Sequence, residues 1–188
     1  EPLLKLRNLK TLSDEDMVNL QRSNLMISSS PNPSVETLLH AFLPHKFVDH
    51  THATPFLVLA NLKNYKNITQ EVFGDKFCIV PYIMPGFKLS KKAIEIYEKN
   101  QKTEAMLLVN HGYFTWGKTA KESYEKVIEH SNQLENWLSK NRKLYQSKKL
   151  NKVNFKYEDF ISIFRRFIIK FSDDENYSPV FDLRNDDF

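Results

Sequence analysis

Three histidines are the residues of this chain whose types and spacing best suit chemistry. His50 and His52 stand two apart in one short segment, and His111 is followed directly by Gly112. Alternate residues of a β-strand share a face, so both members of the pair can point at one ion if their segment is extended. Three imidazole ligands hold a divalent metal and leave a coordination position open for water or substrate. We therefore interpret the three histidines as a candidate metal centre. For the pair alone, the alternative is two partly buried rings satisfied by hydrogen bonds.

Glu36 is the carboxylate best suited to work beside such a centre as a general acid and base. The ordinary alternative is a glutamate in the first turn of a helix, where the helix dipole favours negative charge. Asp49 points away from the pair in a regular strand, so we expect a structural or supporting role for it. His40 and His45 lack matching spacing, and we expect them to be structural or on the surface.

The metal hypothesis requires particular elements to bring these residues together. The alternation of residues 46–52 predicts a strand carrying the histidine pair, and the apolar run 105–109 predicts a strand buried on both faces that ends near His111. Helices are expected to begin after Ser13, Ser34, Thr54, Ser90 and Thr119. The last of these is the longest, with His130 on its surface and with a buried stripe predicted at Tyr124, Val127, Ile128, Ser131, Leu134 and Leu138. The alternation of helices and short strands favours an α/β class.

The character of the chain changes near residue 145. We predict a metal-binding domain over residues 1–145 and an extension over 146–188. The extension would contain a polar linker at 148–154, an amphipathic helix at 157–169 and an acidic, turn-like end from 173.

Composition narrows the possible functions. The 188 residues suit one domain with a sizeable core. Cys78 is the only cysteine, and we expect it in the packed core. A single cysteine allows no internal disulfide, and this cysteine usage suits a cytoplasmic protein. No apolar run is long enough to span a membrane, and no secretory leader is visible.

The 27 basic and 23 acidic residues give a net charge of +4, which is weak support for nucleic-acid binding and is compatible with a small anionic substrate. The basic stretch at 140–152 is interpreted as a solvated helix end. With four glycines and no glycine-rich phosphate motif, nucleotide binding by such loops is not expected.

Three segments in order, residues 33–44, 48–53 and 110–117, resemble the class II aldolase/adducin family. They are most similar to the aldolase half of bacterial proteins that fuse a rhamnulose-1-phosphate aldolase to a short-chain dehydrogenase. The resemblance runs from about residue 12 to residue 140. It implies a three-layer α/β/α sandwich around a central mixed, mostly antiparallel sheet. It also implies a homo-oligomer, with a tetramer as the expectation. The family's glycine-rich phosphate loops normally precede the first matching helix, and this chain begins too late to contain them, so we expect it to be part of a longer polypeptide.

The resemblance also implies roles for single residues. It places Zn²⁺ on His50, His52 and His111, although imidazole ligands also suit cobalt, iron, nickel or copper. It makes Glu36 the acid/base residue. Ser34 matches the family's phosphate-binding Ser-Ser-Glu stretch, whereas Val35 departs from it.

The implied reaction is the metal-dependent cleavage of a ketose 1-phosphate. Rhamnulose 1-phosphate would give dihydroxyacetone phosphate and lactaldehyde, with the ion as Lewis acid. The alternatives are a sugar-phosphate epimerase or dehydratase of the same family, and a non-catalytic adducin-like binding module. Adducin-type domains lack the metal histidines, so the three histidines argue against the last alternative.

Overall fold

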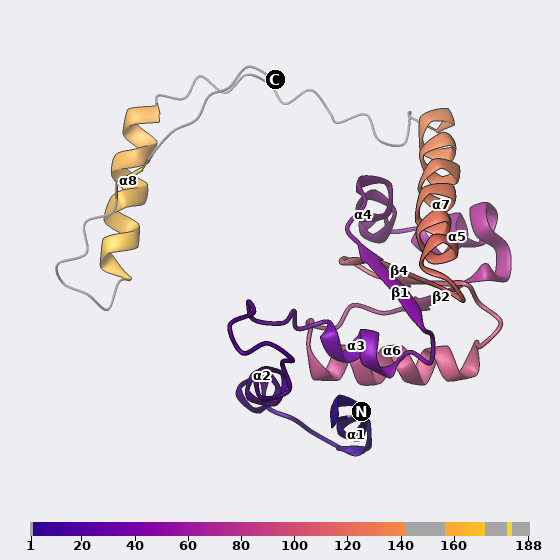
Figure 1. The fold of residues 1–188 in the computed structure, drawn as a ribbon. Coiled ribbons are helices and arrows are strands. Elements are labelled where there is room, and N and C mark those ends of the chain that lie inside the picture. Colours follow the sequence, from indigo (N-terminus) through magenta and orange to yellow (C-terminus); the bar gives the residue numbers. More distant parts are fainter. Residues whose placement is uncertain (1, 142–156, 172–179, 182–188) are drawn as a thin grey trace. The chain divides into compact units, whose positions relative to one another are not determined.

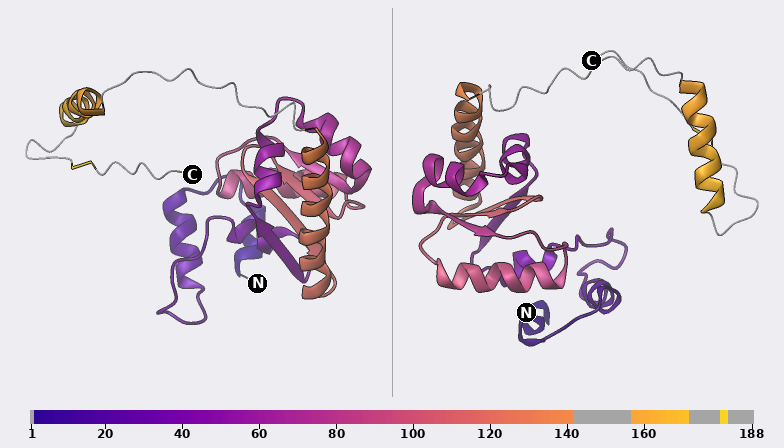
Figure 2. Two further views of the ribbon diagram at one scale, coloured as in Figure 1. Left: turned by 90° about the horizontal axis from the view of Figure 1, so that it is seen from above. Right: turned by 180° about the vertical axis from the view of Figure 1, so that it is seen from behind.

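The computed structural model describes residues 2–141, 157–171 and 180–181, which are drawn as ribbons in Figures 1 and 2. The chain divides into two compact units, Glu1–Leu144 and Tyr145–Phe188. Within the described residues, no helix has both the length and the apolar character needed to cross a membrane. The basic stretch beyond Lys140, the expected linker and the acidic end lie outside the described residues, apart from residues 180–181.

A four-stranded mixed sheet forms the middle layer of the first unit. Its strand order is β1-β4-β3-β2. The pairs β1–β4 and β4–β3 are antiparallel, whereas β2 and β3 are parallel, so the expected mixed and mostly antiparallel sheet is confirmed. The strands are β1 (Phe47–Thr51), β2 (Phe77–Val80), β3 (Ala105–Leu108) and β4 (Gly112–Gly117).

Helices cover both faces of this sheet, as Figure 1 shows with α4, α5 and α7 on one side and α3 and α6 on the other. The strand β3 is buried on both faces because its side chains alternate between two cores: Met106 and Leu108 pack with α3 and α6, whereas Ala105 and Leu107 pack with α4, α5 and α7. The expected three-layer sandwich is therefore confirmed. The helices of this unit are α1 (Pro2–Lys5), η1 (Leu6–Asn8), α2 (Asp14–Ser23), α3 (Thr37–Phe42), α4 (Thr54–Asn61), α5 (Tyr65–Phe73), η2 (Gly74–Lys76), α6 (Phe87–Lys99) and α7 (Ala120–Lys140).

Two helix starts follow the capping residues expected from the sequence. The Ser13 hydroxyl accepts a hydrogen bond from the backbone N–H of Asp16, and the Thr119 hydroxyl accepts one from that of Glu122. Each cap satisfies a backbone donor that the first helical turn leaves unpaired. These contacts position α2 and α7 as predicted.

Three other helix starts differ from the prediction. The helix after Ser34 begins only at Thr37, and α4 has Ala53 at its N-cap position instead of Thr54. The helix α6 begins after Gly86, at Phe87. The hydroxyl of Ser90 lies inside α6 and donates to the carbonyl oxygen of Gly86, so this serine does not cap the helix.

The buried face of α7 was predicted only in part. Leu134 is fully buried, but Tyr124 and Ile128 are exposed, and the polar residues Ser123 and His130 are buried in their place. His130 is accommodated because its Nε2 lies 3.4 Å from a carboxylate oxygen of Glu104. The prediction failed because it followed the apolar side chains at Tyr124 and Ile128 and placed His130 on the surface.

The second unit contains the helix α8 (Tyr157–Lys170), which agrees with the predicted amphipathic helix to within one residue. Beyond its end, Phe181 is described, and the Phe181 ring lies 5.4 Å from that of Phe164.

Candidate metal centre

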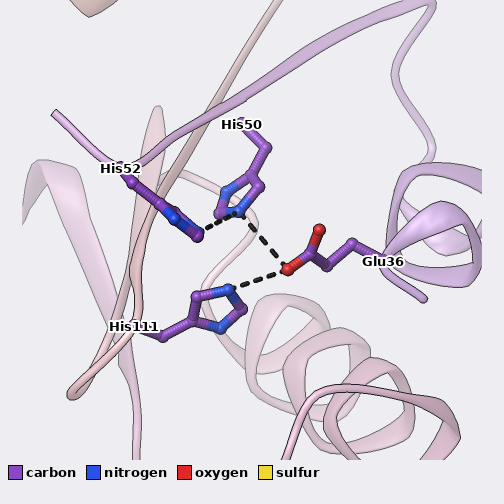
Figure 3. Close-up of side chains that lie close together, drawn as sticks. All are labelled: Glu36, His50, His52 and His111. Atoms are coloured by element: carbon purple, nitrogen blue, oxygen red, sulfur yellow. Dashed lines mark hydrogen bonds and ion pairs between the residues drawn. The ribbon is translucent and has the colours of Figure 1, made fainter. Parts of the chain in front are cut away.

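The three histidines and Glu36 meet at one edge of the sheet. The antiparallel register pairs Thr51 at the end of β1 with Tyr113, and Leu108 at the end of β3 with Gly112. The end of β1 and the β3–β4 turn therefore lie side by side. His50 is in β1, His52 follows directly after it, and His111 immediately precedes β4. Figure 3 shows their rings and the Glu36 carboxylate pointing toward a common space.

The distances among these groups suit a single divalent cation. One donor atom from each of Glu36, His50, His52 and His111 lies within 4.8 Å of all the others. The Nε2 atoms of His50 and His52 are 3.0 Å apart, and Oε1 of Glu36 is 2.8 Å from Nε2 of His111 and 3.6 Å from Nε2 of His50. Metal–ligand bonds of about 2.0–2.1 Å in a tetrahedron place donor atoms about 3.3 Å apart. The set of three nitrogens and one oxygen therefore fits the implied metal.

The ring of His50 is fixed in the orientation that a metal ligand needs. Its Nδ1–H donates to the backbone carbonyl of Tyr113 at 3.0 Å, and the ring stacks on Phe114 with centroids 4.1 Å apart. A hydrogen bond at Nδ1 leaves the lone pair of Nε2 facing the cluster. Burial lowers the pKa of His50 to about 4, so the ring is neutral at pH 7, as metal binding requires.

Gly112 makes room for two of the rings. A Cβ atom at this position would lie 2.7 Å from Cδ2 of His52, 2.8 Å from the carbonyl oxygen of Thr51 and 3.3 Å from Cε1 of His50. Gly112 itself belongs to β4. The turn before it is made by Asn110, whose φ of 57° lies in the left-handed region that asparagine tolerates.

The carboxylate of Glu36 is held by Ser34 as well as by His111. The Ser34 hydroxyl donates to Oε2 of Glu36 at 2.7 Å, and the same hydroxyl accepts from the Glu36 backbone N–H at 3.2 Å. Burial would raise the pKa of Glu36, but the Ser34 hydrogen bond and the electrostatic interactions with the His50 and His111 rings together lower it below its ordinary value. Glu36 is therefore an ionised group, able either to bind a cation or to accept a proton.

The other histidines lie outside the cluster. The half-buried ring of His45 stacks on Trp116 with centroids 5.0 Å apart, and His40 lies 5.1 Å from Phe114, in agreement with structural roles. His130 was expected on the surface, and this is wrong, because only 1% of it is exposed. Cys78 is packed core, as expected.

Sequence reasoning did not identify the residues that support the cluster. Tyr113 acts through a backbone carbonyl, Phe114 through the face of its ring, and Gly112 through the absence of a side chain. Their position in the sequence directly after His111 is the feature from which they could have been identified. A backbone carbonyl that accepts the second ring N–H of a histidine commonly orients that ring toward a metal.

Comparisons with known proteins agree with this fold. Residues 6–138 match the family described as the class II aldolase and adducin N-terminal domain. The chain is 42% identical over 127 residues to the uncharacterized oxidoreductase YuxG of Bacillus subtilis (strain 168), a match covering 68% of this chain and 18% of that protein. It is also similar to the structure of the N-terminal class II aldolase domain of a conserved protein from Thermoplasma acidophilum. That match has 35% identity and a TM-score of 0.66, and covers 73% of this chain and 63% of the other.

The chain therefore belongs to the class II aldolase and adducin family, as the resemblance of its three motifs implied. It spans less than two thirds of the length of these two relatives.

Proposed function

We propose that the chain is the catalytic domain of a metal-dependent aldolase that cleaves a ketose 1-phosphate by a retro-aldol reaction. Rhamnulose 1-phosphate is the substrate that the sequence motifs favour, with dihydroxyacetone phosphate and lactaldehyde as products. The observation that carries the proposal is the convergence of three imidazoles with an ionised carboxylate, whose Oε1 lies 2.8 Å from Nε2 of His111. A non-catalytic, adducin-like binding module would not require three histidines and a carboxylate at one point.

The residues of the site divide into two roles. His50, His52 and His111 would hold the cation, for which zinc is the favoured candidate. When bound, such an ion supplies Lewis-acid stabilisation for the negative charge that develops on the substrate oxygens. Glu36 would move the proton on and off the carbon released by bond cleavage, since it is ionised and lies beside the ligands.

Ser34 is the proposed contact for the substrate phosphate. Its side chain is exposed, and its hydroxyl already orients Glu36. The hydroxyl of Ser34 has a single donor hydrogen, so donating it to a phosphate oxygen would release the carboxylate of Glu36. Phosphate binding would thereby be linked to the position of the acid/base residue.

The wider protein is also part of the proposal. A relative that is much longer than the matched region is described as an oxidoreductase, which supports a fused short-chain dehydrogenase partner for this domain. Assembly into a homo-oligomer, with four copies as the expectation, and a cytoplasmic location are proposed on the family resemblance and the single cysteine.

Product analysis separates the possible reactions. The purified chain, loaded with Zn²⁺ or Co²⁺, is incubated with rhamnulose 1-phosphate and with other ketose 1-phosphates, and the products are identified by NMR. Dihydroxyacetone phosphate together with an aldehyde supports the lyase. An epimerised or dehydrated sugar phosphate would replace the lyase proposal with one of its family alternatives.

Substitution of Glu36 then tests the acid/base role. Glu36→Gln keeps the size of the side chain and removes its basicity, so turnover should fall by about 10²-fold or more while the metal content stays unchanged. The matched control is Glu71→Gln, since Glu71 lies outside the cluster, on α5, where it accepts a hydrogen bond from Trp137. Full activity in Glu36→Gln would remove this residue from the mechanism.

A further inference from the structure

The helix α8 carries a row of exposed phenylalanines. Phe160, Phe164, Phe167 and Phe171 recur at steps of four, three and four, which places them on one side of an α-helix that continues through its last turn. Their rings contact one another along the row, with centroids 5.4 Å apart for Phe160–Phe164 and 4.7 Å apart for Phe167–Phe171.

Much of this row is open in the second unit. Phe167 is 59% exposed, Phe171 is 67% exposed, and the neighbouring Ile163 is 70% exposed. Phe181 contacts the row at Phe164, yet 40% of Phe164 is still exposed. A contiguous apolar surface of this kind marks an interaction site.

The spacing of the row indicates a helical partner. Steps of three and four produce the narrow seam by which two helices pack together. Helix α8 has 14 residues, which at 1.5 Å per residue gives about 21 Å, close to two heptads. The surface is therefore long enough to pair with one helix of similar length.

The charges of α8 indicate which helix that is. Its acidic residues, Glu158 and Asp159, lie in the first turn, whereas Arg166 and Lys170 lie in the second half. Two copies placed antiparallel bring the acidic end of each opposite the basic half of the other, whereas a parallel pair would place like charges together. Helix dipoles also favour the antiparallel arrangement.

We propose that the phenylalanine row of α8 is a self-association surface, which binds α8 of a second copy of this chain in an antiparallel pair. A lipid surface fits the same helix less well, because membrane-surface helices carry mainly lysine and arginine on their polar face and α8 has two carboxylates in its first turn. The phenylalanine row and the metal centre have no residue in common, so the proposal does not depend on the proposed reaction.

Sedimentation equilibrium of the whole chain tests the surface. The double variant Phe164→Asp/Phe167→Asp should raise the dissociation constant of self-association by about 100-fold or more, because it places charges in the seam. The matched control is Ile169→Asp, which introduces the same charge on the other side of the helix and should leave association unchanged. Circular dichroism of both variants verifies that helix content is retained. Equal association of wild type and the double variant would overturn the proposal.

Cross-linking tests the antiparallel orientation. The only native cysteine, Cys78, is buried, so introduced thiols are the accessible ones. Chains with Asp159→Cys mixed with chains carrying Lys170→Cys should form disulfide-linked heterodimers faster than either forms homodimers. Preferential homodimers would instead indicate a parallel pair and contradict the proposal. Binding of the wild type to phosphatidylglycerol vesicles without any self-association would replace the second copy with a membrane.

Discussion

Gly112 lies so close to His52 that any side chain there would displace the ring: a Cβ at position 112 would be 2.7 Å from Cδ2 of His52. The carbonyl oxygen of Thr51 closes the other side at 2.8 Å, so the backbone offers no room for adjustment. A residue with no side chain is thus required for two candidate ligands to reach their positions.

Gly112→Ala should therefore weaken metal binding, and the backbone shift that it requires should also lower the stability of the domain. We expect at least about a tenfold loss of Zn²⁺ affinity, comparable to losses from disturbing groups that support metal ligands. Competition titration with a chromophoric chelator measures this loss. The control is Gly74→Ala, which meets no atom within 4 Å but is strained by its φ of 58°, and so should lower stability while keeping metal affinity. Unchanged affinity in Gly112→Ala would contradict the steric argument.

Ser34 should affect catalysis through its hydrogen bond to Glu36. Ser34→Ala removes a bond to a charged group, and interactions of this kind contribute about 1.5–3 kcal/mol. We expect kcat to fall by roughly 10-fold or more, and Ser34→Thr, which keeps a hydroxyl, to recover most of the loss. Steady-state kinetics of the two variants checks this. An alanine variant that changes only KM would confine Ser34 to substrate binding.

The buried His130 should make the stability of the first unit sensitive to acid. Burial lowers its pKa from the ordinary 6.5, which outweighs the raising effect of Glu104. The unfolded chain consequently binds the proton first as pH falls, so the contribution of His130 is present above pH 6.5 and is lost as pH falls toward the folded-state pKa.

Thermal unfolding of wild type and His130→Gln measures this contribution. The midpoint of wild type should fall as pH decreases from about 7.5 to 5.5. His130→Gln cannot titrate, so its midpoint should fall less over that interval, while the two pH dependences should run parallel above pH 7.5. Parallel curves throughout the range would exclude His130 as a source of acid sensitivity.

The buried face of α7 gives a prediction about stability alone. Leu134 is fully buried, so Leu134→Ala should destabilise the chain by about 2–5 kcal/mol. Ile128 is 45% exposed, so Ile128→Ala should cost less, roughly 1 kcal/mol or below. Urea unfolding of both variants compares the two costs. Equal losses would mean that α7 packs as its apolar periodicity alone suggested.

Part of the fold and of the candidate site could be predicted from the sequence, and part could not. The layers, the strands and the convergence of the three histidines could be predicted, since they depend on local alternation, an apolar run and short motifs. The burial of His130 could not, because it depends on Glu104, a partner 26 residues away that offsets the cost of burying a polar ring. The contact between Glu36 and His111 spans 75 residues and is set by the packing of α3 against the sheet, so the residue pattern could propose it without fixing its geometry.

The central claim is that His50, His52 and His111 hold one divalent cation together. Elemental analysis of the purified chain after Zn²⁺ loading and dialysis should give about one zinc per chain, and zinc should be absent from His50→Ala but retained by His45→Ala, in which a histidine outside the cluster is removed. A crystal of the loaded wild type should place one anomalous peak between the three rings. Full zinc content in His50→Ala, or a peak at a site away from these imidazoles, would contradict the account.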